Sequence, residues 1–125
     1  MSNHEEAFVK GFVEVNRQER FLGFLDDAKK RRKLIAEFDH LKFGFLDRKF
    51  MIPLRGAGSL PPNVFAALRK MGAPETCWAM GGRFDGQEQE LLQALRESGD
   101  GFVLSCIPGR LAYIKTEDEE FILRR

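Results

Sequence analysis

Five consecutive basic residues, Lys29-Lys30-Arg31-Arg32-Lys33, are the strongest chemical signal in the sequence. A run of this kind is typical of proteins that bind nucleic acid through its phosphates. A helix, however, turns by about 100° per residue, so five successive side chains wrap around more than one full turn and cannot all face one groove. We therefore expect the run to form mainly a solvated helix exterior. Nucleic-acid binding through Lys29, Lys30, Arg31 and Lys33 is the alternative.

Within this run, Arg32 falls near the centre of the apolar stripe that Phe21 defines, if one helix covers both residues. The residues one turn away on either side, Ala28 and Ala36, are both small. An inward arginine in this setting has three alternatives: its head group extends past the edge of the core, it pairs with a carboxylate such as Asp39, or it faces a pocket for an anionic ligand or partner. Arg32 and Asp39 are therefore candidate binding residues.

The two cysteines, Cys77 and Cys106, lack the surroundings of a reactive thiol. A nucleophilic cysteine needs a histidine or a helix N-terminus nearby to form the thiolate, and the sequence places neither His4 nor His40 beside one. A metal site needs about four ligands at set spacings, whereas the cysteines and histidines are scattered from residue 4 to residue 106. We expect both thiols to pack in the core, with no metal and no cofactor.

The segment 102–114 predicts a β-hairpin that turns at Pro108-Gly109. A loop of two residues would place Ile107 opposite Arg110. A type II turn, which Pro-Gly favours, matches the twist of a two-residue hairpin poorly. A wider loop, with a slip of the strand register by one residue, is therefore the alternative.

Alternation along the hairpin divides its residues between two faces, and both faces are largely apolar. One face carries Phe102, Leu104, Cys106, Leu111 and Tyr113. The other face carries Val103, Ser105, Ile107, Arg110, Ala112 and Ile114. Because a strand that is apolar on both sides must be covered twice, we expect either the segment 39–58 or a second copy of the chain to cover the second face.

The elements that must position these residues follow from the periodicity of the apolar positions. Apolar residues at helical spacing predict helices over residues 5–15, 17–38 and 61–71, and a fourth after 85–88. Strand-like runs lie at 76–80, 101–107, 110–116 and 121–123. This order predicts a single α+β domain over residues 1–125, with about four helices packed on one face of a small, mostly antiparallel C-terminal sheet of three to four strands and one right-handed βαβ crossover.

Two sequence patterns predict where helices begin. Asn16-Arg17-Gln18-Glu19 and Asp85-Gly86-Gln87-Glu88 both have the form of a capping box, in which the first side chain accepts a free amide and the glutamate reaches back. We therefore expect the second helix to begin just after Asn16 and the fourth just after Asp85; a helix that continues through Asn16 is the alternative for the first of these.

The bulk composition predicts a soluble protein of ordinary domain size. The chain has 125 residues, of which 43% are hydrophobic and 31% charged, and its net charge of +1 recruits neither nucleic acid nor an anionic membrane. The N-terminal residues do not form a signal peptide, and no apolar run approaches the ~20 residues that span a bilayer. We expect a cytoplasmic location in which both thiols stay reduced.

These features predict a non-catalytic interaction or regulatory module that binds another protein or itself, with a homodimer formed through the hairpin as one form. No Ser-His-Asp arrangement or nucleotide-binding motif favours an enzyme. One alternative is nucleic-acid binding through residues 29–33. The other is a small enzyme or anionic-ligand binder whose pocket is formed by Arg32, Arg83, Cys106, Arg110 and Tyr113.

Overall fold

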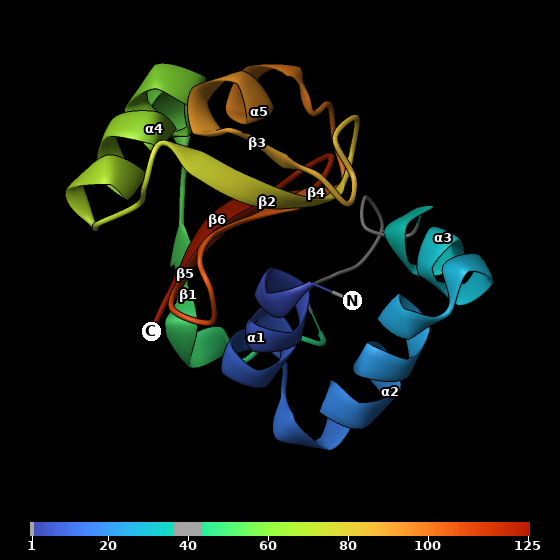
Figure 1. Ribbon diagram of the computed structural model, residues 1–125. Coiled ribbons are helices and arrows are strands. Elements are labelled where there is room, and N and C mark those ends of the chain that lie inside the picture. The colour runs from blue at the N-terminus through green and yellow to red at the C-terminus, as the bar shows by residue number, and fades with distance from the viewer. Residues whose placement is uncertain (1, 37–43) are drawn as a thin grey trace.

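Six strands form one antiparallel sheet within residues 2–36 and 44–125, which are the residues that the computed structural model describes (Figure 1). The spatial order of the strands is β1-β6-β5-β4-β2-β3. Their bounds are β1 Met51–Pro53, β2 Thr76–Gly81, β3 Glu88–Glu90, β4 Phe102–Ile107, β5 Leu111–Lys115 and β6 Glu120–Arg124. The hairpin strands β4 and β5 therefore lie in the middle of the sheet, and the two shortest strands, β1 and β3, form its edges.

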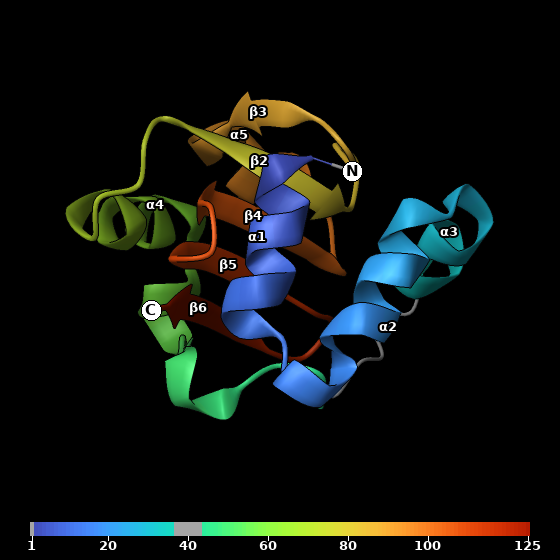
Figure 2. The same ribbon diagram turned by 60° about the horizontal axis from the view of Figure 1, so that its bottom comes forward.

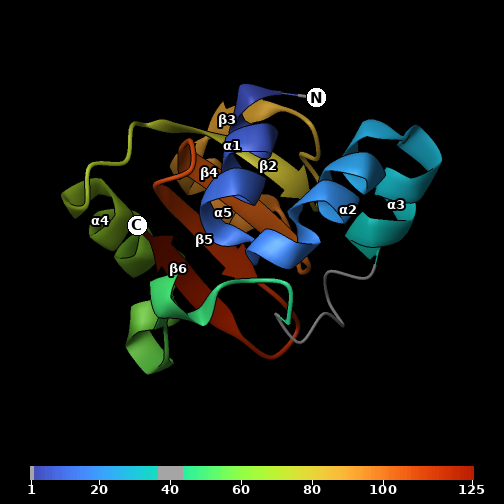
Figure 3. The ribbon, with the colours of Figure 1, turned by 90° about the horizontal axis from the view of Figure 1, so that it is seen from below.

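Helices cover both faces of this sheet, whereas the sequence predicted helices on one face only (Figure 2). α1 lies across one face, α4 and α5 lie on the other, and α2 and α3 pack beside each other next to α1 (Figure 3). The helix bounds are α1 Asn3–Phe12, α2 Val15–Asp26, α3 Ala28–Ala36, α4 Pro61–Lys70 and α5 Leu91–Glu97, with short 3-10 helices η1 Arg48–Phe50 and η2 Gly56–Ser59. The α+β class is confirmed, with five helices and six strands in the described residues instead of about four helices and three to four strands.

The β4–β5 hairpin is apolar on both faces, and helices of the same chain cover both. The residues that pack in the core under α4 and α5 include Phe102, Leu104, Cys106, Leu111 and Tyr113, as the alternation predicted. The opposite core contains Val103, Ala112 and Ile114 together with Phe8, Val9 and Phe12 of α1. In the described part of the segment 39–58, Phe45 and Leu46 join this second core. Helix α1 is therefore the main cover of the face for which the sequence left two candidates.

The turn of the hairpin is wider than two residues. Ile107 pairs with Leu111 rather than with Arg110, because a β-bulge between Ser105 and Ile107 shifts the register. Gly109 has a φ of 71°, and the Arg110 amide donates a hydrogen bond of 2.9 Å to the Ile107 carbonyl across the turn. The wider loop that Pro-Gly favours is thus confirmed. Ile107 packs with the α4 and α5 core, not on the face predicted for it.

The chain does not make the expected parallel crossover from β2 to β4. β3 carries the chain back along β2 before α5 begins, and α5 then returns it to the end of the sheet at which β2 stops. β4 therefore runs antiparallel to β2, with Gly81 opposite Phe102. The predicted capping box that starts at Asp85 is also wrong, because Glu88 belongs to β3 and α5 begins only at Leu91.

The long helix predicted over residues 17–38 is divided into α2 and α3. Asp27 interrupts it with extended backbone angles (φ −110°, ψ 118°). The Asp27 carboxylate accepts hydrogen bonds of 3.0 Å from the amides of Lys29 and Lys30, so it caps the N-terminus of α3. The predicted cap at Asn16 is wrong, because Asn16 lies inside α2.

Helix α1 packs so closely against the hairpin turn that the two backbones leave no room for a side chain at Gly11. A Cβ atom placed on Gly11 of α1 would lie 2.5 Å from the carbonyl oxygen of Gly109. No larger residue fits there unless the helix or the turn moves. A Cβ atom placed on Gly23, inside α2, would have no atom within 4 Å.

We expect Gly11→Ala to lower the free energy of unfolding by about 1–3 kcal/mol, because the added methyl group forces α1 away from the turn. Gly23→Ala is the matched control. It is expected to raise the free energy of unfolding by about 0.5–1 kcal/mol, because alanine restricts the unfolded chain and favours the helix. Urea denaturation of the two variants measures both changes, and equal effects would contradict the close approach at Gly11.

Candidate functional site

A buried carboxylate connects α1, α3 and the sheet. Glu5 lies in α1 and is 2% exposed. Its two oxygens accept hydrogen bonds from the Arg31 guanidinium of α3, and Oε2 also accepts a bond of 2.7 Å from the indole N–H of Trp78 in β2. A charged group that is removed from water requires partners of this kind. Glu5 therefore fixes the position of α3 against α1 and β2.

The guanidinium of Arg31 also binds Asp85, in the turn between β2 and β3. Nη2 of Arg31 lies 2.8 Å from Oδ1 of Asp85, and this oxygen accepts the amide of Gly81 at 2.8 Å. Partial burial opposes the positive charge of Arg31, but its hydrogen bonds to Glu5 and Asp85 outweigh that effect and raise its pKa. Arg31 is therefore a cation with two acidic partners.

His4 adds a neutral ring to this arrangement at the start of α1. The ring stacks on Trp78 with a centroid distance of 6.3 Å and an interplanar angle of 10°, and its Nδ1 lies 2.8 Å from the hydroxyl oxygen of Ser105. Desolvation lowers the pKa of His4, and the charge of Glu88 offsets this only in part. We refer to His4, Glu5, Arg31, Trp78, Asp85 and Ser105 as the polar cluster.

The contact between His4 and Ser105 has the composition of a base and a nucleophile, but its burial prevents that chemistry. Ser105 is 1% exposed, so a substrate cannot reach its hydroxyl. The thiols of Cys77 and Cys106 are buried as well, and burial raises the pKa of both, that of Cys77 to about 12. These groups stabilise the fold and do not form a reactive centre.

Arg31, and not Arg32, is the inward arginine of the basic run. The break at Asp27 starts a new helix with its own rotation, so a stripe counted from Phe21 does not continue into α3. The Arg32 residue is exposed, and its predicted partner Asp39 lies outside the described residues. Of the alternatives for an inward arginine, pairing with carboxylates is the one that Arg31 shows.

The other predicted binding residues do not share one site. Arg83 is exposed and pairs with Glu97 at 3.3 Å, and Arg110 is exposed on the hairpin turn. Cys106 and Tyr113 are buried in the core under α4 and α5. Neither Arg83 nor Arg110 therefore shares a site with the buried side chains of Cys106 and Tyr113.

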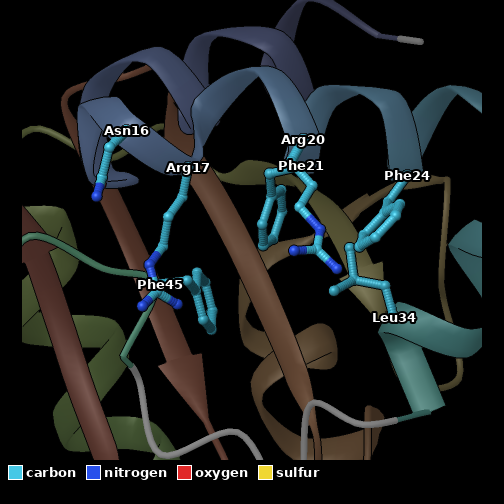
Figure 4. Close-up of a pocket in the computed structure, with 7 residues that line it drawn as sticks. All are labelled: Asn16, Arg17, Arg20, Phe21, Phe24, Leu34 and Phe45. Carbon is cyan, nitrogen blue, oxygen red and sulfur yellow. The ribbon is translucent and has the colours of Figure 1, made fainter.

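A pocket lies between α2, α3 and the segment around Phe45 (Figure 4). Its volume is about 530 Å³, and its lining within the described residues consists of Asn16, Arg17, Arg20, Phe21, Phe24, Leu34 and Phe45. A smaller hollow of about 250 Å³ adjoins it and is lined by Arg20, Phe24, Lys30, Lys33 and Leu34. The two hollows share three lining residues, and we refer to them together as the α2–α3 groove.

Aromatic rings form the walls of this groove. Phe21 and Phe45 stack with their centroids 5.1 Å apart, and each is 6% exposed. The guanidinium of Arg20 lies over the ring of Phe24, 5.4 Å from its centroid. Figure 4 shows the side chains of Arg17 and Arg20 extending from α2 toward Phe45 and Leu34. The groove thus has apolar walls and a cationic edge.

The cations along the groove have few acidic partners. Arg17 lies 4.0 Å from Glu14 and keeps more than half of its side chain exposed. Within the part of the chain that the structure describes, no carboxylate oxygen lies within 4.0 Å of a side-chain nitrogen of Arg20, Lys30 or Lys33. These three side chains form no ion pair within the described residues, although the backbone amide of Lys30 and also its charge help to lower the pKa of the nearby Asp27 carboxylate.

The basic run is divided among three directions, as the helical period predicted. Arg31 points into the polar cluster, Lys30 and Lys33 line the groove, and Lys29 and Arg32 are exposed. The run therefore does not present one continuous basic face.

The groove and the polar cluster were not predicted from the sequence. Local signals existed for the groove, since Arg17 and Arg20 lie three residues apart on α2, as do Lys30 and Lys33 on α3. The polar cluster had no such signal. Glu5 finds its partners 26 and 73 residues further along the chain, at Arg31 and Trp78.

Comparison of the chain with protein-family models, with curated proteins and with solved structures gave no match. In the described residues, no group of three or more histidine, cysteine, aspartate or glutamate side chains is placed to hold a metal ion. Nor does any helix in residues 2–36 and 44–125 have the length and apolarity needed to cross a membrane. Any functional conclusion must therefore come from the geometry of the chain itself.

We expect Arg31→Met to lower the free energy of unfolding by about 3–5 kcal/mol, because it leaves the Glu5 carboxylate buried without its cation. Arg32→Met is the matched control, and we expect an effect within about 0.5 kcal/mol, because Arg32 is exposed. Guanidinium denaturation followed by circular dichroism measures both. The opposite order of effects would identify Arg32 as the inward residue.

The lowered pKa of His4 predicts a loss of stability in mild acid. Because the unfolded chain binds this proton more readily than the folded chain, the contribution of His4 is complete above pH 6.5, the ordinary histidine value, and declines below it. The thermal midpoint should therefore fall between about pH 7 and about pH 5. The thermal midpoint of His4→Asn should fall less over the same pH range. Because His40 is present in both proteins, identical pH profiles of the two midpoints would rule out the role of His4.

Proposed function

We propose that the chain is a non-catalytic binding module whose α2–α3 groove binds an anionic ligand or partner that also has an apolar part. One observation carries this proposal: four basic side chains surround apolar walls, and three of them lack a carboxylate partner in the described residues. Such cations attract anions through charge-assisted hydrogen bonds. A ligand that displaces water from the apolar walls lowers the free energy of the complex.

The chemistry of the lining favours binding over catalysis. Proton transfer and nucleophilic attack need groups such as histidine, cysteine, serine or a carboxylate at the reacting atoms. The described lining of the groove consists of arginine, lysine, asparagine, phenylalanine and leucine. These side chains can hold an anion, but they provide no general base or nucleophile.

Charge alone accounts for a small part of the affinity that we expect. An exposed ion pair contributes about 1 kcal/mol or less, so the removal of two cations should weaken binding by about tenfold. The rest must come from apolar contact, chiefly with the half-buried Phe24, because Phe21, Leu34 and Phe45 are only 6–8% exposed. A ligand that has only charge, or only an apolar surface, would use half of the groove.

The hairpin provides less support for self-association than its sequence suggested. Both of its faces are covered by helices of the same chain (Figure 2). Self-association stays a prediction, and it has no free hairpin face on which to form. Nucleic-acid binding through residues 29–33 also stays a prediction, with Arg31 engaged by Glu5 and Asp85.

Anilinonaphthalene sulfonate, an aromatic anion that fluoresces in apolar surroundings, tests this proposal. We expect saturable binding to the native chain, and about tenfold weaker binding to the double variant Arg20→Gln/Lys33→Gln, because two unpartnered cations are lost. Added salt should weaken binding to the native chain more than binding to this variant, because salt screens the removed charges.

The matched control is Lys70→Gln/Arg96→Gln, which removes two exposed cations from α4 and α5 on the other side of the sheet. It should bind the probe like the native chain. Circular dichroism confirms that both variants are folded. Equal weakening by the two double variants, or no weakening by either, would contradict a binding site in the α2–α3 groove.

A further inference from the structure

The cations of the groove form two rows, one on each helix. Arg17 and Arg20 form the row on α2, and Lys30 and Lys33 form the row on α3. In each row the two residues are three positions apart, so they are separated by about one helical turn, roughly 4.5 Å along the axis. The smaller hollow is lined by cations of both rows, and the apolar side chains of Phe24 and Leu34 line both hollows. An elongated occupant with an apolar stripe and anionic flanks would match this lining.

The rings of the groove are not available as stacking platforms for nucleobases. Phe21 and Phe45 stack on each other and are each 6% exposed, and Phe24 carries the guanidinium of Arg20 on its face. Single-stranded nucleic acid relies on exposed aromatic faces for its bases. The arrangement of the rings therefore disfavours nucleic acid as the occupant.

A free phosphate is also a poor match for this distribution of charge. Compact anions are held by donors that converge on one point, such as an arginine fork or a set of backbone amides. Here the cations are spread over two helices on either side of an apolar wall, and Asn16 is the only neutral polar side chain in the described lining. A small inorganic anion would meet one part of the cationic edge and leave the walls uncovered.

We infer that the groove binds an acidic amphipathic peptide segment of another protein, most simply a helix with an apolar stripe and carboxylates one turn apart on its flanks. This inference rests on the proposed function of the groove. Recognition would follow the helix-in-groove mode, in which apolar side chains enter the groove and charges on the rim set the orientation. Glutamate or aspartate at i and i+3 or i+4 of the peptide would match the spacing of the cations in each row.

Isothermal titration calorimetry with synthetic peptides of about 15 residues tests this inference. The first peptide carries leucine along one helical face and glutamate on both flanks. The second has glutamine in place of glutamate, and the third has the composition of the first in scrambled order. We expect the first peptide to bind the native chain at least about tenfold more tightly than the other two. We also expect Arg20→Gln/Lys33→Gln to weaken this binding about tenfold and Lys70→Gln/Arg96→Gln to leave it unchanged.

Pyrophosphate and a single-stranded oligonucleotide serve as competing ligands in the same experiment. Tighter binding of either one to the native chain, or equal binding of the three peptides, would overturn the inference. Sedimentation of the chain alone would also overturn it if a dimer forms that Arg20→Gln/Lys33→Gln abolishes, because the occupant would then be a second copy. If the native chain binds anilinonaphthalene sulfonate but not the first peptide, only the peptide inference is refuted. If the native chain binds neither, the groove itself is refuted as a binding site.

Discussion

The burial of the Glu5 carboxylate is the constraint on which the arrangement of the helices depends. A carboxylate that is 2% exposed must be paired, and its partners come from two other elements, Arg31 of α3 and Trp78 of β2. Arg31 in turn recruits Asp85 from the turn after β2. The pair α2 and α3 is therefore held beside α1 by charge as well as by apolar packing. The position of the groove between these two helices is a consequence of that attachment.

Those parts of the fold that depend on local pattern could be predicted from the sequence. Period-two alternation is a property of the strand itself, so it placed Leu104 and Tyr113 on one face and Val103 on the other, as the structure has them. The β-bulge ahead of Ile107 could not be derived in the same way. It is a shift in strand pairing between Ser105 and Ile107, and alternation within one strand does not determine how that strand pairs with its neighbour.

The error at the basic run has a single physical origin. An apolar stripe that runs from Phe21 through Asp27 requires one continuous helix, whereas the side-chain cap at Asp27 starts a new helix with its own rotation. The inward position consequently moves from Arg32 to Arg31. The groove was beyond reach for a related reason, because its cations come from α2 and α3, which pack side by side only after the chain turns at this break. Local spacing marks each row, but the distance between rows belongs to tertiary structure.

The two edges of the sheet decide from which side another molecule can approach. β1 and β3 are three residues long, Pro53 offers no amide on one edge, and Glu88 and Glu90 place negative charge on the other. Short, charged or proline-containing edge strands resist pairing with a further strand. The sheet is therefore protected against growth into fibrils and against recruitment by strand addition.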